Sequence, residues 1–339
     1  MAHLPIQNSK LMFPMKSIPV INLTPLRENT APDTIPQQIA EACRTHGFFY
    51  VTGHGVSTAL QTRLAQQSQT FFALSEAEKM EIAMHKGGKA WRGFFPVGAE
   101  LTSGKPDQKE GIYFGTELGT DDPRVQAGIP LHGPNLFPKH PEGFHETVLE
   151  YMDAVTQVGH LILKGISLSL GLDPDYFYRK YQQEPLILFR IFHYPSQPME
   201  YDGWGVGEHT DYGLLTILKQ DTVGGLQVKS GDEWIDAPPI ENTFICNIGD
   251  MLDRMTGGHY RSTPHRVLNT SGKDRYSFPL FFDPGFDTHI EKIETITTAG
   301  DDQHQRWDNA SVHTFEGTYG DYLLNKVSKV FPELRRDLL

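Results

Sequence analysis

The sequence predicts a mainly β protein with flanking helices and a jelly-roll core. Short β-type segments fill the second half of the chain, and Gly, Pro, Asp and Asn separate them without regular βαβ alternation. We therefore expect residues 1–180 to form an N-terminal helical region with a substrate-covering loop, packed on the core. Residues 181–339 are expected to form the jelly-roll domain with a C-terminal helix.

Apolar residues at helical spacing characterise the first region. The segment "TIPQQIAEACRTHGFFYVTGHG" predicts an amphipathic helix followed by a strand-like "FFYV". Helical spacing continues over residues 57–74 and again, as one long helix, over residues 143–172. Residues 86–142 are rich in Gly and Pro and show little periodicity, so we expect a long loop there with a functional role.

The second region consists of short β segments followed by a helical stretch. The final "GDYLLNKVSKVFPEL" predicts a helix that packs back on the β unit. The predicted strands cover residues 186–194, 214–219, 225–229, 243–248, 265–269 and 276–282.

Composition excludes several classes of partner. A formal net charge of −12 leaves no basic face for a polyanion, so we expect no nucleic-acid partner. The N-terminus lacks the apolar stretch of a signal peptide, and no apolar run is long enough to span a bilayer. Cys43 and Cys246 fit reduced, buried thiols. We expect a soluble, cytoplasmic protein without a membrane partner, and the sequence leaves its oligomeric state open.

The segment "GEHTDYGLLTIL" places His209 and Asp211 two residues apart at the predicted start of a strand. Residues i and i+2 of a strand point to the same face, which suits two ligands of one ion. His265 in "STPHRV" is the candidate for a third ligand. Two imidazoles and one carboxylate leave coordination positions open, as in non-haem Fe(II) oxygenases, whereas a structural zinc site closes its shell, usually with cysteines. Any one of these residues alone is more often an ordinary polar side chain, so the joint pattern carries the hypothesis.

Several motifs together resemble a known family. "HTDYGLLTIL", "NIGDMLDRMTGGHYRSTPHRV" and "DRYSFPLFF", with "IPVINL" and "HGFFYVTGHGV" near the N-terminus, are similar to Fe(II)- and 2-oxoglutarate-dependent oxygenases of the isopenicillin N synthase-like group. The resemblance covers most of the chain. It implies a double-stranded β-helix, a form of jelly roll, with Fe(II) held by His209, Asp211 and His265. It also implies 2-oxoglutarate as cosubstrate and O2 as oxidant.

Arg275 and Ser277 lie on one face of a predicted strand by the same i, i+2 rule. A guanidinium binds a carboxylate through two parallel hydrogen bonds, and a nearby hydroxyl can add a third. This pair is therefore the candidate for the distal carboxylate of 2-oxoglutarate. The resemblance adds Tyr194 to this site, while Phe192 stands where relatives commonly have an asparagine. Arg190 matches a position that is often basic in the family.

The long loop is also similar to bacterial ethylene-forming enzymes, which oxidise arginine and fragment 2-oxoglutarate. Residue matching then makes Glu100, Thr102 and Tyr212 candidate substrate contacts, although a solvated loop explains the first two equally well. The match fails near the C-terminus, where Lys329 and Val330 stand in place of an arginine.

The leading hypothesis is an oxygenase that oxidises a small organic molecule, by hydroxylation or a related reaction, and releases succinate and CO2. The alternatives are an ethylene-forming-type enzyme, an oxidase that needs no 2-oxoglutarate, a metal-assisted hydrolase, and a non-enzymatic binding module on the same fold. The sequence does not identify the substrate.

Overall fold

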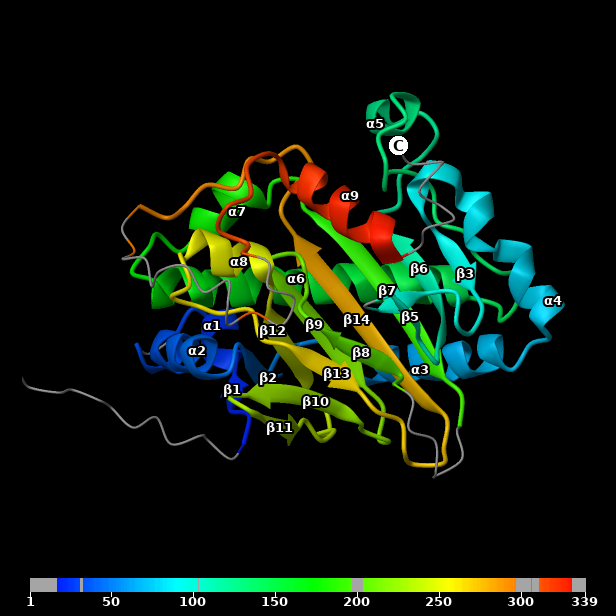
Figure 1. The fold of residues 1–339 in the computed structure, drawn as a ribbon, viewed down its shortest axis with the longest axis horizontal. Helices are drawn as coiled ribbons and strands as arrows, with labels where there is room; N and C mark the ends of the chain where they lie inside the picture. The colour runs from blue at the N-terminus through cyan, green and yellow to red at the C-terminus, as the bar shows by residue number, and fades with distance from the viewer. Residues whose placement is uncertain are drawn as a thin grey trace, which may run out of the picture.

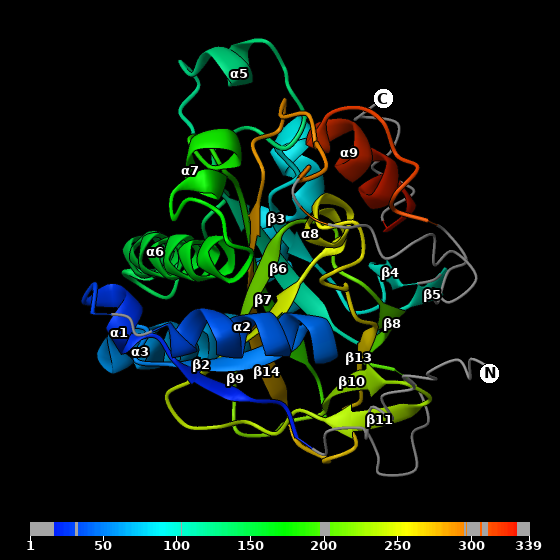
Figure 2. The same ribbon diagram turned by 90° about the vertical axis from the view of Figure 1, so that its left-hand side faces the viewer.

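A computed structural model gives the structure of the protein. It describes residues 17–30, 33–102, 104–196, 204–294, 296, 306 and 311–330. Within these residues, two β-sheets face each other and helices cover the outer face of the larger one, as Figures 1 and 2 show.

The large sheet has eight strands in the order β1-β2-β12-β9-β14-β7-β6-β3 among the described residues. All neighbours in it are antiparallel except β1 and β2. The strands are β1 (Val20–Asn22), β2 (Phe48–Thr52), β12 (Phe244–Ile248), β9 (Leu215–Gln220), β14 (Arg275–Asp283), β7 (Leu186–Tyr194), β6 (Glu110–Gly115) and β3 (Gly93–Phe95).

Where the chain is described, the small sheet has four antiparallel strands in the order β11-β10-β13-β8. A short hairpin, β4–β5, lies beside β8 (Figure 2). The bounds are β11 (Glu233–Asp236), β10 (Leu226–Ser230), β13 (His265–Val267), β8 (Val206–His209), β4 (Leu101–Thr102) and β5 (Lys105–Pro106).

Helices α1, α3, α6 and α7 lie on one side of the large sheet, whereas α9 lies on the side of the small sheet (Figure 2). The helices are α1 (Thr24–Arg27), α2 (Thr34–Thr45), α3 (Thr58–Phe72), α4 (Glu76–Lys79), α5 (Pro123–Gln126), α6 (Phe144–Ser169), α7 (Tyr176–Tyr181), α8 (Asp250–Met255) and α9 (Tyr319–Val330), with 3-10 turns at Met80–Ile82 and Met84–Ala90.

Side-chain alternation along β14 separates the core from the site. Phe278, Leu280 and Phe282 are buried, and Phe282 packs against α6 at Gly159. A Cβ atom on Gly159 would lie 2.8 Å from the Phe282 ring, so glycine is needed for this close helix–sheet packing. Arg275 and Ser277 alternate with these residues and line a cavity between the two sheets.

The structure confirms the predicted fold class, a double-stranded β-helix with flanking helices. All six strands predicted in the second region are present: 186–194 matches β7 at both ends, and the ends of the other five differ by at most two residues. The C-terminal helix is present as α9, and residues 331–334 of the prediction lie outside the described residues. The division into regions 1–180 and 181–339 stays a prediction.

Residues 86–142 differ from the predicted loop, because they contain β3 to β6 and α5. Strand β6 pairs with β7 over six residues, and β3 pairs with β6. A sheet neighbour that comes from distant sequence supplies the hydrogen bonds here, and local periodicity does not reveal such a neighbour. No helix among the described residues is long and apolar enough to cross a membrane.

Candidate active site

His209, Asp211 and His265 come together at one end of the small sheet. His209 ends β8 and His265 begins β13, and the two residues are direct partners in the antiparallel pairing of these strands. Asp211 lies in the loop between β8 and β9, not on a strand. The two side chains converge as expected, but the expectation that they share one strand face was wrong, because the strand ends at His209.

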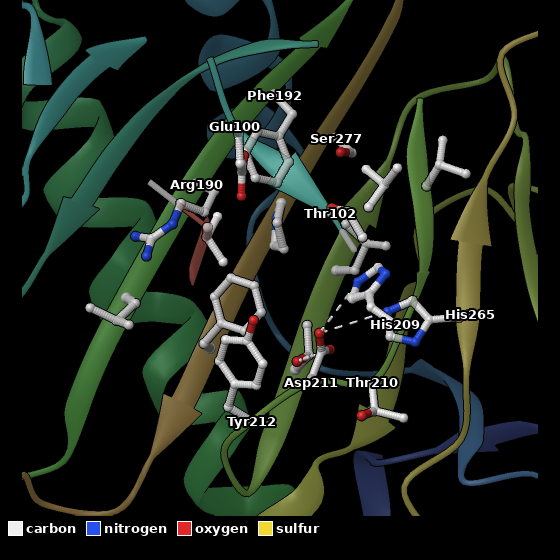
Figure 3. A pocket seen from close by; sticks show the side chains of 18 of the residues that line it. Glu100, Thr102, Arg190, Phe192, His209, Thr210, Asp211, Tyr212, His265 and Ser277 are labelled. Carbon is white, nitrogen blue, oxygen red and sulfur yellow. Dashed lines mark hydrogen bonds and ion pairs between the residues drawn. The ribbon is translucent and has the colours of Figure 1, made fainter. Parts of the chain in front are cut away.

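The three side chains are arranged as ligands of one ion. One ligand atom from each residue lies within 4.8 Å of the other two, and both Nε2 atoms face Asp211 Oδ1, at 3.8 Å from His209 and 3.7 Å from His265 (Figure 3). The Nδ1–H groups donate to backbone carbonyls, at 2.8 Å from His209 to Gly207 and 3.2 Å from His265 to Thr263. These bonds fix the tautomer that leaves each Nε2 lone pair free for a metal.

Two buried side chains orient Asp211. Thr216 on β9 and Asn247 on β12 donate hydrogen bonds to Oδ2 at 2.5 Å and 2.7 Å, which leaves Oδ1 directed at the imidazoles. Burial opposes ionisation of Asp211, but His265 and His209 hold its pKa below the usual range. Burial, reinforced by His209, lowers the pKa of His265 to about 4. An ionised carboxylate and neutral imidazoles are the protonation states that a divalent cation requires.

Sequence analysis missed Thr216 and Asn247. The available signal was a polar residue inside an otherwise apolar strand, "FICNI" in the case of Asn247.

Arg275, Ser277 and Tyr194 form a second cluster on β14 and β7. Arg275 pairs with Tyr194 across the two strands, Ser277 Oγ lies 3.5 Å from the Tyr194 hydroxyl, and the guanidinium lies 4.6 Å from the centre of the Tyr194 ring. Arg275 is fully buried, and its Nε donates to the carbonyl of Gly224 at 2.5 Å. Its Nη1 and Nη2 atoms have no hydrogen-bond partner among the described residues.

The Nη1 and Nη2 atoms of Arg275, called here the Arg275 fork, suit a carboxylate ligand. Leaving buried N–H donors unsatisfied is unfavourable, and a carboxylate can accept from both Nη atoms at once. The chain thus has donor sets that fit Fe(II) and the distal carboxylate of 2-oxoglutarate.

Both clusters line one cavity of about 560 Å³. Glu100, Thr102 and Tyr212, the expected substrate contacts, also line it (Figure 3). Tyr113 donates to Glu100 Oε1 at 2.6 Å and Lys109 lies 3.0 Å from Oε2, while Thr102 donates to Asp107 at 2.8 Å. The two loop residues therefore belong to a bonded network and not to a solvated loop.

Arg190 lines the cavity on the side away from the metal-ligand candidates, and its guanidinium points away from them (Figure 3). Its Nη1 donates to the carbonyls of Phe114 and Phe189, and burial lowers its pKa. Asp283 at the end of β14 also lines the cavity, and burial raises its pKa to about 7. Lys109, Asp283 and Lys326 are lining residues that sequence analysis missed.

Comparison with known proteins identifies the family. Residues 18–140 match the model of the non-haem dioxygenase N-terminal region described for morphine synthesis, and residues 185–284 match that of the 2OG-Fe(II) oxygenase superfamily. A Dictyostelium discoideum protein named "probable iron/ascorbate oxidoreductase" is 54% identical, with 90% of this chain and 91% of the relative covered. The chain belongs to the Fe(II)/2-oxoglutarate-dependent oxygenases of the isopenicillin N synthase-like family.

Other relatives of this oxygenase have named substrates. A 1-aminocyclopropane-1-carboxylate oxidase of Dictyostelium discoideum is 39% identical over 94% of this chain and 96% of its own. A homoarginine-6-hydroxylase of Arabidopsis thaliana is 35% identical, with coverages of 96% and 93%. The crystal structure of a Neurospora crassa protein in complex with alpha-KG and thymine superposes with a TM-score of 0.76 at 28% identity, over 92% of this chain and 96% of that one. The protein is thus an Fe(II)- and 2-oxoglutarate-dependent oxygenase.

Proposed function

We propose that this oxygenase hydroxylates a small amino-acid-like molecule, with Fe(II) held by His209, Asp211 and His265. The dependence on 2-oxoglutarate is supported by Arg275. Its guanidinium is buried in the same cavity as the three ligand candidates, and Nη1 and Nη2 have no partner among the described residues. Arg275, Ser277 and Tyr194 would bind the distal carboxylate of 2-oxoglutarate and orient its keto-acid end towards the metal. Bound Fe(II) supplies the oxidative chemistry that converts 2-oxoglutarate and O2 to succinate and CO2.

The protein's own contribution is orientation and shielding. Thr216 and Asn247 keep one oxygen of Asp211 occupied, so that the other stays available to the ion. The walls of the cavity are formed by buried strands, which exclude water from the reacting centre. In this proposal the substrate would bind beside the three ligand candidates, in the part of the cavity that Glu100, Thr102 and Tyr212 line.

The charges of the cavity support an amino-acid-like substrate. Acidic Glu100 and Asp283 and basic Lys326 line it, so both ends of a zwitterion can find a complementary group. Relatives named for 1-aminocyclopropane-1-carboxylate and for homoarginine act on molecules of this class. The cytoplasmic location and the absence of nucleic-acid and membrane partners stay predictions based on composition.

The test is a substrate screen with the Fe(II)-loaded protein. Amino acids, including 1-aminocyclopropane-1-carboxylate, L-homoarginine and L-arginine, and a comparison set of uncharged aromatic and terpenoid compounds are each mixed anaerobically with 2-oxoglutarate, and succinate is measured after air is admitted. We expect at least one amino acid to raise succinate release and to gain one oxygen atom by mass spectrometry. Stimulation only by uncharged aromatic or terpenoid compounds would reject the amino-acid class.

The match to the 2OG-Fe(II) oxygenase superfamily favours an oxygenase over an oxidase that needs no 2-oxoglutarate, whereas the Arg275 fork suits a carboxylate of either cosubstrate or substrate. Oxygen uptake with the best substrate should therefore depend on 2-oxoglutarate. Equal uptake without 2-oxoglutarate would identify the oxidase alternative instead.

A further inference from the structure

Lys109 places a buried ammonium group in the wall of the cavity, directly before β6. The residue is 1% exposed and lines the same cavity as the metal-ligand candidates and Arg275. A buried ammonium is strongly disfavoured unless carboxylates surround it, so its partners indicate what the residue does.

The ammonium group joins the two ends of the β4–β5 hairpin. It lies 3.0 Å from Oε2 of Glu100, just before the hairpin, and donates a still closer hydrogen bond to Asp107, just after it. The amide of Asp107 also donates to the carbonyl of Glu100 at 2.9 Å. Lys109 therefore fastens both ends of the β4–β5 hairpin at one point in the wall of the cavity.

The fastened hairpin forms the wall next to the metal-ligand candidates. Thr102 in β4 packs on Gly207 of β8, where an added Cβ atom would lie 3.2 Å from Thr102 Cγ2. Gly207 also accepts the hydrogen bond that orients His209. The position of the hairpin is thus coupled to the strand that carries this imidazole.

Without the Lys109 ammonium, the charges around this position would repel an anionic ligand. One ammonium and two carboxylates carry a net charge of −1 when all are ionised. Burial raises the pKa of Asp107, and Glu100 and Asp107 raise the pKa of Lys109 although burial alone would lower it. Removing the ammonium would leave both carboxylates uncompensated beside a cavity that must accept the dianion 2-oxoglutarate.

The ammonium group lies close to the proposed cosubstrate site. It is 4.9 Å from the centre of the Phe192 ring. Phe192 on β7 pairs directly with Ser277 on β14, and both side chains line the cavity. A charge at this position acts on the region between Ser277 and the metal-ligand candidates.

We infer that Lys109 is a positioning residue for 2-oxoglutarate: it fastens the hairpin over the cavity and offsets one of the two negative charges that would otherwise repel the cosubstrate. The inference rests on the proposed binding of 2-oxoglutarate beside Arg275. Unlike Arg275, Lys109 acts through Glu100 and Asp107 and not by direct contact.

The test measures the affinity for 2-oxoglutarate from the anaerobic Fe(II)–keto-acid charge-transfer band. In Lys109→Met we expect the Kd to rise by about tenfold to a hundredfold, the range for losing one nearby unit charge at a protein-like dielectric constant. Adding Asp107→Asn to that variant restores the original net charge but not the ion pairs that fasten the hairpin, so the Kd should fall by about threefold or more relative to Lys109→Met. Circular dichroism and thermal melting establish that each variant is folded.

Lys79→Met is the matched control. Lys79 is also buried and ion-paired, at 2.7 Å from Glu110, but it does not line the cavity. Its variant should lose stability without a change in Kd. An unchanged Kd in Lys109→Met, an equal loss in Lys79→Met, or no recovery in the double variant would each overturn the inference. A missing band in the wild-type protein would instead reject the proposed cosubstrate site.

Discussion

Replacement of Arg275 by glutamine tests the proposed cosubstrate site most directly. The guanidinium is fully buried, and Nη1 and Nη2 have no partner among the described residues, so both are available to a carboxylate. Losing a buried, charge-assisted partner weakens binding by about 2–5 kcal/mol, or roughly thirtyfold to several thousandfold. Ser277→Ala removes a single neutral hydrogen bond and should weaken binding by about tenfold or less.

In the absence of 2-oxoglutarate, the stability of the protein should depend little on Arg275. Because the described residues leave the Nη atoms of Arg275 without a hydrogen-bond partner, Arg275→Gln should cause little or no loss of stability in the absence of 2-oxoglutarate. Wild-type protein at a ligand concentration of about one hundred times Kd gains about 2.7 kcal/mol, which corresponds to a rise in Tm of roughly 4 °C. The variant should lose most of this rise.

Two assays measure these effects on the same samples. Titration of the anaerobic charge-transfer band gives Kd, and thermal melting with and without 2-oxoglutarate gives the shift in Tm. Arg92→Gln is the matched control, because Arg92 is equally buried and has two nitrogens without a hydrogen-bond partner in the described part of the chain, but does not line this cavity. An unchanged Kd in Arg275→Gln, or the same loss in Arg92→Gln, would refute the assignment.

Three further outcomes are expected. Asn247→Ala removes one of the hydrogen bonds that orient Asp211 and should weaken Fe(II) binding by about 10- to 100-fold, measured by metal titration; unchanged affinity would exclude an orienting role. The pKa of Asp283 is raised to about 7 in the folded protein, so its contribution to stability is present below about pH 4 and is lost as pH rises to 7. From about pH 4 to pH 7, the free energy of unfolding of wild type should therefore fall by about 2–4 kcal/mol relative to that of Asp283→Asn, measured by urea titration. Parallel pH profiles of the two proteins would contradict the assignment. With L-arginine supplied, succinate and CO2 should form with little or no ethylene in headspace gas chromatography, since the Arg275–Ser277 pair is intact; ethylene as a major product would support the ethylene-forming alternative.

The sequence by itself determined the β core and the chemistry of the candidate site. Alternation with period two and turn residues are local properties, so β7 and β14 could be placed within one or two residues. The same rule put Arg275 and Ser277 on one face. The spacing of His209, Asp211 and His265, together with the motifs around them, was enough to indicate the family.

Only the tertiary structure decided how these groups meet. The loop after β8 brings Asp211 to the imidazoles, β12, distant in sequence, supplies Asn247, and the nearby β9 supplies Thr216. From the sequence, Lys109 cannot be distinguished from an ordinary charged residue. Its burial and its ion pairs with two carboxylates form only when the hairpin is folded. Local patterns report what one segment prefers, whereas burial, charge balance and hydrogen-bond partners arise from segments that only the fold brings into contact.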